Sequence, residues 1–252
     1  MKVIAICVVL LALTASAARA NWVPQYQTDF SSDPGWTTSD PTNYYWNSSN
    51  GTYYIKQVNI NYGGNYAYHD VTNNAGSFQL AYDIKMLQGG YASGLNFGMY
   101  DSDLNAHDNG SYIHVSFVTD DNGHPIRNGG QNASNIGVPG WWPFPQWALN
   151  TWYTVGMEYS ADTGSFTTTI RNRDTGDLIA TESSTAGPFS PGMTYLGNSN
   201  IRNVAYQAPG AFSIAEIDNV VFSTQAIPAP GAVVLGVIGV GLVSRLRRRG
   251  IL

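Results

Sequence analysis

The chain has 252 residues, of which 12 are Lys or Arg and 17 are Asp or Glu. Half of the basic residues lie in the two ends, so residues 21–226 carry a net charge of about −11. Nucleic acids and anionic membrane surfaces bind proteins through a basic footprint, and this charge argues against both as partners. The one cysteine, Cys7, lies in the N-terminal end, so residues 21–226 contain no disulfide.

The first 20 residues have the three parts of a secretory signal peptide. Lys2 gives a basic start, residues 3–13 form an apolar core, and Ala18 and Ala20 supply the small residues that a signal peptidase requires. We expect cleavage between Ala20 and Asn21 and export of the body of the protein.

Between the two ends, the dominant sequence pattern has a period of two. Residues 77–87 alternate apolar side chains with mainly polar ones, the pattern of a long strand with one buried face. Asp-Thr-Gly at 162–164 and at 174–176 indicates hairpin turns. Further strands are expected at residues 52–58, 95–100, 112–119, 152–160, 165–172, 178–183 and 212–222. Because no stretch of the body shows a sustained helical period, we predict one all-β domain over residues 21–226.

Oxygen ligands cluster at residues 101–108. Four of them are candidates for holding calcium: Asp101, Asp103, Asn105 and Asp108. An EF-hand is excluded, because Ala106 and Tyr112 stand where that loop requires Gly and Glu. Two interpretations stay open, a calcium site of another geometry and a solvated turn between strands. No other cofactor is expected.

The loop at residues 122–150 is rich in aromatic side chains. Four of them lie among prolines: Trp141, Trp142, Phe144 and Trp147. Proline fixes φ and can hold its neighbours in a preset arrangement, and flat aromatic faces suit the apolar faces of sugar rings. These four residues are therefore candidate contacts for a polysaccharide. The alternative is that they fold down as a hydrophobic lid over one end of the domain.

The last 26 residues, 227–252, read as a membrane and sorting segment. The motif Pro228-Ala229-Pro230 precedes about 13 apolar residues, which as a helix cover roughly 20 Å of a hydrocarbon core about 30 Å thick. Four arginines then follow, and these are expected to stay cytoplasmic: Arg245, Arg247, Arg248 and Arg249. We expect a short helix that holds the chain transiently in the inner membrane, with the body on the far side.

This tail resembles the PEP-CTERM sorting signal of diderm bacteria, in which a Pro-Glu-Pro motif, an apolar Gly-rich helix and a terminal Arg cluster follow in that order. The resemblance covers about a tenth of the chain. It implies processing by an exosortase-type membrane transpeptidase and delivery to the cell surface or the extracellular matrix. Ala229 stands where the family has Glu, which leaves the processing enzyme open. The alternative is a simple single-pass anchor.

The body resembles the concanavalin A-like lectin/glucanase superfamily, including its laminin-G-like branch. The resemblance spans residues 26–225 and is carried by segments such as SFQLAYDIKML at 77–87, SYIHVSFVTDDNG at 111–123 and AEIDNVVF at 215–222. It implies a jelly-roll β-sandwich of two antiparallel sheets. Because the superfamily includes sugar-binding modules, glycoside hydrolases and adhesive domains, the fold alone does not choose a function.

Laminarinase- and lichenase-type members carry Glu-x-Asp-x-Glu, or the same motif with one extra residue, because retaining hydrolysis needs two carboxyl groups about 5–5.5 Å apart. The nearest match here begins at Glu216 and Asp218, but Val220 and Val221 occupy both places for the second Glu. We interpret Glu216 as part of a surface strand and expect no catalytic residue.

These patterns predict an exported, non-catalytic protein of the cell surface or extracellular matrix that binds an extracellular polysaccharide. Two alternatives stay open. One is a structural or adhesive matrix component without a specific ligand, and the other is a glycoside hydrolase with an unrecognised carboxylate pair.

Overall fold

The computed structural model describes residues 22–58, 66–71, 76–89, 94–100, 112–118, 130–133, 147–185, 195–199 and 212–225. Trp22–Thr224 form one compact unit. The predicted signal peptide with its cleavage site, the sorting tail and the calcium candidates at residues 101–108 lie outside the described residues. Within the ranges given above, no helix has the length and apolar character needed to cross a membrane.

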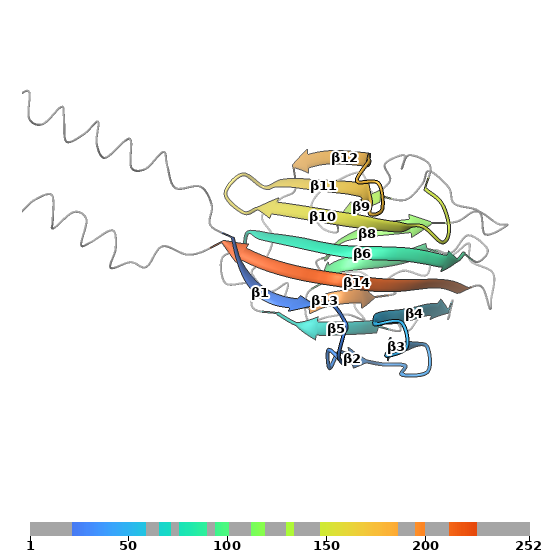
Figure 1. The fold of residues 1–252 in the computed structure, drawn as a ribbon. Helices are drawn as coiled ribbons and strands as arrows, with labels where there is room; N and C mark the ends of the chain where they lie inside the picture. Colours follow the sequence, from blue (N-terminus) through green and yellow to red (C-terminus); the bar gives the residue numbers. More distant parts are fainter. Residues whose placement is uncertain are drawn as a thin grey trace, which may run out of the picture. The chain divides into compact units, whose positions relative to one another are not determined.

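Two antiparallel sheets pack face to face as a jelly-roll sandwich (Figure 1). The large sheet has eight strands in the order β12-β11-β10-β6-β14-β4-β3, and β1 pairs with β14 off this path. The small sheet has six strands in the order β2-β5-β13-β7-β8-β9. The strands of the large sheet are β1 (Trp22–Thr28), β3 (Tyr44–Asn47), β4 (Thr52–Val58), β6 (Phe78–Gln88), β10 (Trp152–Ser160), β11 (Ser165–Asn172), β12 (Leu178–Thr185) and β14 (Phe212–Gln225). Those of the small sheet are β2 (Thr37–Thr38), β5 (Tyr66–Asp70), β7 (Gly94–Tyr100), β8 (Tyr112–Val118), β9 (Gly130–Ala133) and β13 (Tyr195–Ser199).

Strand β6 is central to the large sheet, since it pairs with β10 on one side and with β14 on the other. Its alternate apolar side chains are all buried, as the period-two pattern predicted: Phe78, Leu80, Tyr82, Ile84 and Met86. The side chains between them point to the outer face of the sheet. Asp83 is buried there as well, because polar partners from two neighbouring strands surround it.

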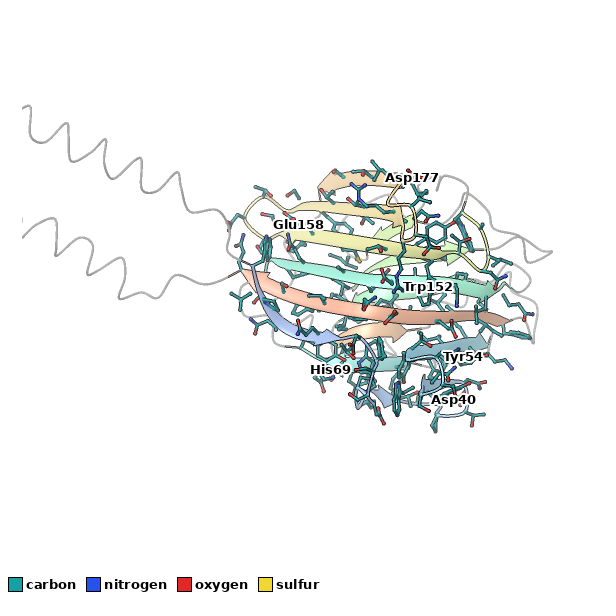
Figure 2. All side chains as sticks on the ribbon, in the orientation of Figure 1. Asp40, Tyr54, His69, Trp152, Glu158 and Asp177 are labelled. Carbon is teal, nitrogen blue, oxygen red and sulfur yellow. The ribbon has the colours of Figure 1, made fainter. Side chains whose placement is uncertain are left out.

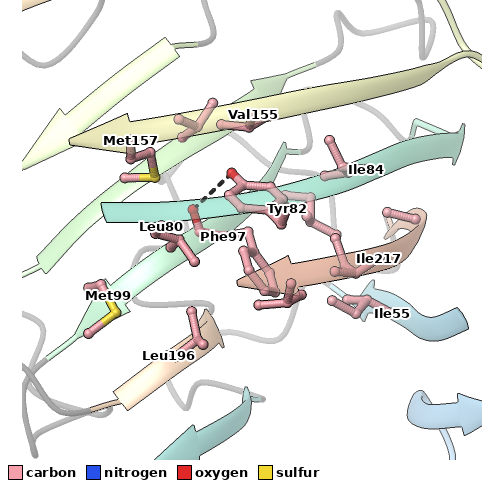
Figure 3. Close-up of a cluster of buried hydrophobic side chains, with 14 of the residues drawn as sticks. Ile55, Leu80, Tyr82, Ile84, Phe97, Met99, Val155, Met157, Leu196 and Ile217 are labelled. Carbon is pink, nitrogen blue, oxygen red and sulfur yellow. Dashed lines mark hydrogen bonds between the residues drawn. The ribbon is translucent and has the colours of Figure 1, made fainter. Parts of the chain in front are cut away.

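The hydrophobic core lies between the two sheets (Figure 3). Tyr82 of β6 meets Phe97 of β7 across it, with ring centroids 4.5 Å apart, and the Tyr82 hydroxyl donates to the Phe97 carbonyl oxygen at 3.2 Å. Leu196 of β13 and Ile217 of β14 are fully buried in the same core. Burial of each large apolar side chain contributes about 1.5–3 kcal/mol, so this layer holds the sheets together.

Both predicted Asp-Thr-Gly hairpins are present. Gly164 closes the β10–β11 connection with φ of 64°, and Gly176 closes the β11–β12 connection with φ of 77°. Glycine adopts positive φ without the steric cost that a Cβ imposes. In the second turn, Asn172 Oδ1 also accepts hydrogen bonds from the backbone N–H groups of Asp174 at 2.9 Å and Thr175 at 3.0 Å.

Candidate functional site

Of the four candidate aromatic residues in the loop at 122–150, the structure describes Trp147 alone, and this residue belongs to the core. It is 2% exposed, and its ring meets Phe117 edge-on with centroids 5.5 Å apart. The next residue, Ala148, donates its backbone N–H to the Tyr153 hydroxyl at 2.8 Å. A buried indole presents no face to a ligand, so Trp147 packs rather than binds in this structure. Trp141, Trp142 and Phe144 lie outside the described residues and stay predictions.

Glu216 belongs to β14, the strand that was expected at residues 212–222. It lies on the outer face of the large sheet but is only 3% exposed. Lys85 Nζ lies 2.6 Å from one of its carboxylate oxygens, and Asn50 Nδ2 donates to the other at 2.8 Å. The register that pairs Glu216 with Lys85 across β14 and β6 explains this burial.

Asp83 and Asp218 form a second charged group beside Glu216 on this face. Asp83 Oδ2 lies 3.2 Å from Arg173 Nε and accepts a hydrogen bond from Asn219 Nδ2 at 2.8 Å. Arg173 Nη1 also lies 3.1 Å from Asp218. Asn219 has φ of 49° and lies in a β-bulge, which is why its side chain reaches Asp83. One guanidinium thus compensates both carboxylates, so they serve as a structural cross-link between β6 and β14.

Trp152 lies beside this charged group but is already engaged. Lys85 Nζ is 4.7 Å and Arg173 Cζ is 5.0 Å from its ring centroid. Figure 2 shows Trp152 and Glu158 toward opposite ends of β10. Because two cations cover the indole, it offers little free aromatic surface to a sugar.

The two remaining glutamates do not form a catalytic pair. Glu158 lies on the outer face of β10, where its Oε2 accepts a hydrogen bond from Gln79 at 2.7 Å. Glu182 lies on the inner face of β12, opposite the buried Thr168, and burial raises its pKa. Side chains on opposite faces of one sheet cannot flank the same glycosidic bond. Nor does any group of three or more His, Cys, Asp or Glu within the described ranges have an arrangement suited to a metal ion.

A trough of about 400 Å³ lies on the outer face of the large sheet. Ala81 and Gly156 are cross-strand partners that form the floor of the trough. Because they have little or no side chain, the surface is hollowed at this point. Its walls carry hydroxyl, amide and carboxylate groups, from residues such as Thr167, Gln79 and Glu158. None of its lining residues is aromatic, so the trough has no surface on which a sugar ring can stack.

The outer face of the small sheet carries a cluster of tyrosines that is separate from the main core. We call it the tyrosine face, and it comprises Tyr66, Tyr68, Tyr100 and Tyr195. Tyr68 lies between two of the others, with ring centroids 4.4 Å from Tyr195 and 5.7 Å from Tyr66. Tyr100 is buried, and the other three are half-buried and pack against it.

Strand register explains why these tyrosines gather on one face. Tyr66 and Tyr68 alternate with Ala67, which is fully buried in the core, so the tyrosines must point outward. Tyr195 pairs with Tyr100 of β7, and Gly197 pairs with both Tyr68 and Gly98. The rings therefore border two neighbouring glycines, where the sheet has no side chains of its own.

Gly197 is required at this point. Its φ is 159°, and a Cβ added to it would lie 2.1 Å from the Ala67 carbonyl oxygen of β5. No side chain fits that space without moving the backbone of the neighbouring strand. Gly197 therefore permits the close pairing of β13 with β5 beside the tyrosines, and both Gly197 and Gly98 are buried.

The tyrosine face can recognise sugars chemically. Burial raises the pKa of the Tyr68 phenol, and the neighbouring Tyr195 and Asp70 raise it further, so this hydroxyl keeps its proton at neutral pH. A protonated phenol both donates and accepts hydrogen bonds, while its ring supplies apolar contact area. Sequence reasoning missed this cluster; the signal that could have found it was alternate tyrosines in the short segment YAYHD at 66–70.

No protein-family model and no curated protein matches the chain. Several solved structures have the same fold. The basic winged bean lectin with Tn-antigen is 12% identical with a TM-score of 0.57, over 83% of this chain and 100% of the lectin. Peanut lectin with a nine-residue peptide is 14% identical with a TM-score of 0.55, over 83% and 100% of the two chains. The alginate lyase Aly36B is 19% identical with a TM-score of 0.51, over 79% of this chain and 88% of the lyase. The architecture of this protein is thus the concanavalin A-like jelly roll.

Proposed function

We propose that this protein is a non-catalytic carbohydrate-binding protein and that the tyrosine face is its sugar site. The observation that carries the proposal is the four-tyrosine cluster beside Gly197 and Gly98. Three half-buried rings on the outer face of a sheet present apolar area next to phenol hydroxyls. Sugar rings offer the matching combination of C–H faces and hydroxyl groups.

Two further observations favour binding over catalysis. Asp83, Asp218 and Glu216 are all engaged with Arg173 or Lys85, so their carboxylates already serve the fold. The similar structures include lectins whose names record galactose or Tn-antigen as ligand, which supports a sugar as the ligand class. The alginate lyase among them keeps a catalytic role as the competing hypothesis.

A binding screen with a product assay tests this function. Full-length protein is titrated with a panel of soluble neutral and acidic polysaccharides, and each mixture is then assayed for reducing ends and for unsaturated uronates. We expect saturable binding to at least one polysaccharide without new reducing ends or unsaturated products. Product that accumulates with time would establish an enzyme, and absence of binding to every polysaccharide would leave a structural matrix component.

Export and sorting of the protein, as predicted from the sequence, are also part of the proposal. The signal peptide cleaved between Ala20 and Asn21, together with the Pro228-Ala229-Pro230 motif and its arginines, would deliver the body to the cell surface or extracellular matrix. Trp141, Trp142 and Phe144 of the aromatic loop remain proposed additional contacts for the polysaccharide, and calcium at residues 101–108 remains a proposed ligand.

Processing of the tail makes its own prediction. An exosortase-type enzyme would cut near Pro228, so protein isolated from native cells should lack the arginine cluster. Intact-mass spectrometry measures this directly. A mass that still includes Arg245, Arg247, Arg248 and Arg249 would show that the tail acts as a simple anchor.

A further inference from the structure

The charged groups of this domain are distributed unequally between its two sheets. The four basic side chains in the described ranges all belong to the large sheet or its β11–β12 turn: Lys56, Lys85, Arg171 and Arg173. The six strands of the small sheet contain no Lys or Arg. A polysaccharide that reaches the tyrosine face therefore meets no cation on those strands.

Asp70 is the acidic residue of the small-sheet strands, and it belongs to the tyrosine face. It shares the outward side of β5 with Tyr66 and Tyr68, and it pairs with Tyr195 of β13. It is exposed, and no described cation or hydrogen-bond donor is bonded to its carboxylate. Its charge also contributes to the raised pKa of Tyr68, which places the carboxylate near that phenol.

The absence of Lys and Arg from the small-sheet strands and the carboxylate of Asp70 both favour an uncharged ligand over an anionic one. A free carboxylate accepts hydrogen bonds from two neighbouring hydroxyl groups of a sugar, and such charge-assisted bonds are stronger than neutral ones. The same carboxylate repels the carboxylates of a uronate polymer, and the body charge of about −11 adds to that repulsion.

We infer that the tyrosine face selects uncharged polysaccharides and that Asp70 is the residue that sets this selectivity. The inference rests on the proposed sugar-binding function and adds the class of ligand. The ligand class inferred for this protein thus differs from alginate, the acidic polymer in the name of the similar lyase.

The test compares neutral glucan, mannan and xylan with alginate and polygalacturonate at low and at high salt. We expect full-length protein to bind at least one neutral polymer, with affinity that changes less than about twofold between the two salt concentrations, and to bind neither uronate. Asp70→Asn should weaken neutral binding about tenfold. Asp70→Lys should add uronate binding at low salt that disappears at high salt.

Asp162 provides the matched control. It is an exposed carboxylate in the β10–β11 turn of the large sheet, so Asp162→Lys changes the net charge equally without touching the tyrosine face. Equal melting temperatures of all variants show that folding is preserved. Tighter binding to a uronate than to every neutral polymer would overturn the selectivity while leaving sugar binding intact. The same effect from Asp162→Lys as from Asp70→Lys would show that Asp70 does not set the selectivity. No binding to any polymer would contradict the proposed sugar-binding function as well.

Discussion

Gly197→Ala is expected to lower the free energy of unfolding by about 3 kcal/mol or more, because the new Cβ has no space. It would lie 2.1 Å from the Ala67 carbonyl oxygen and 2.8 Å from the Tyr68 Cα, both backbone atoms of β5. Strands β13 and β5 must move apart, which breaks pairing in the middle of the small sheet. Thermal unfolding should show a melting temperature lower by roughly 6–12 °C.

Gly156→Ala is the matched control for this prediction. Gly156 also lies within a strand, but the nearest atom to its added Cβ is the Thr169 carbonyl oxygen at 4.0 Å, an ordinary contact. Its stability should change by less than about 1 kcal/mol, since alanine also has the lower unfolded-state entropy. If the two variants melt at the same temperature, the strand pairing described for Gly197 is incorrect.

Phe97→Ala should cost about 3–5 kcal/mol, the usual range for deletion of a fully buried large aromatic ring. The ring contacts Tyr82 of the opposite sheet at 4.5 Å and Trp36 at 5.9 Å between centroids, so its loss opens a cavity between the sheets. Denaturant unfolding measures the effect. Tyr82→Phe removes only the hydroxyl that bonds the Phe97 carbonyl and should cost about 1 kcal/mol. Equal losses in the two variants would contradict a core held by ring packing.

Much of the fold could be predicted because long strands repeat the period-two pattern many times. All eight expected strands are present, and β6 buries each of its predicted apolar residues. Six strands were not predicted: β1, β2, β3, β5, β9 and β13. All of them except β1 have five residues or fewer. In β5 the pattern is inverted, since the small Ala67 faces the core while Tyr66 and Tyr68 face outward. Hydrophobicity alone assigns such a strand to the wrong face.

The site was harder to predict because it depends on register between distant segments. Tyr68 and Tyr195 are 127 positions apart in sequence and meet only because β5 pairs with β13. Glu216 is paired with Lys85, which lies on another strand and 131 positions away in sequence. Trp147 stood out among aromatic neighbours, yet its ring fills the core beside Phe117. Composition identified the aromatic residues, and strand pairing decides which of them can meet a ligand.

The most direct measurement of the central claim is the polysaccharide affinity of the double variant Tyr68→Ala/Tyr195→Ala. Its control is Tyr45→Ala/Tyr54→Ala, which removes a stacked tyrosine pair, with centroids 4.8 Å apart, from the outer face of the large sheet. Affinities are measured below the melting temperature of both variants. Loss of the two rings of the tyrosine face should weaken binding by about 2 kcal/mol or more, roughly thirtyfold, while the control keeps the affinity of the unmodified protein. Unchanged affinity in the tyrosine-face variant, or an equal loss in the control, would contradict sugar binding by the tyrosine face.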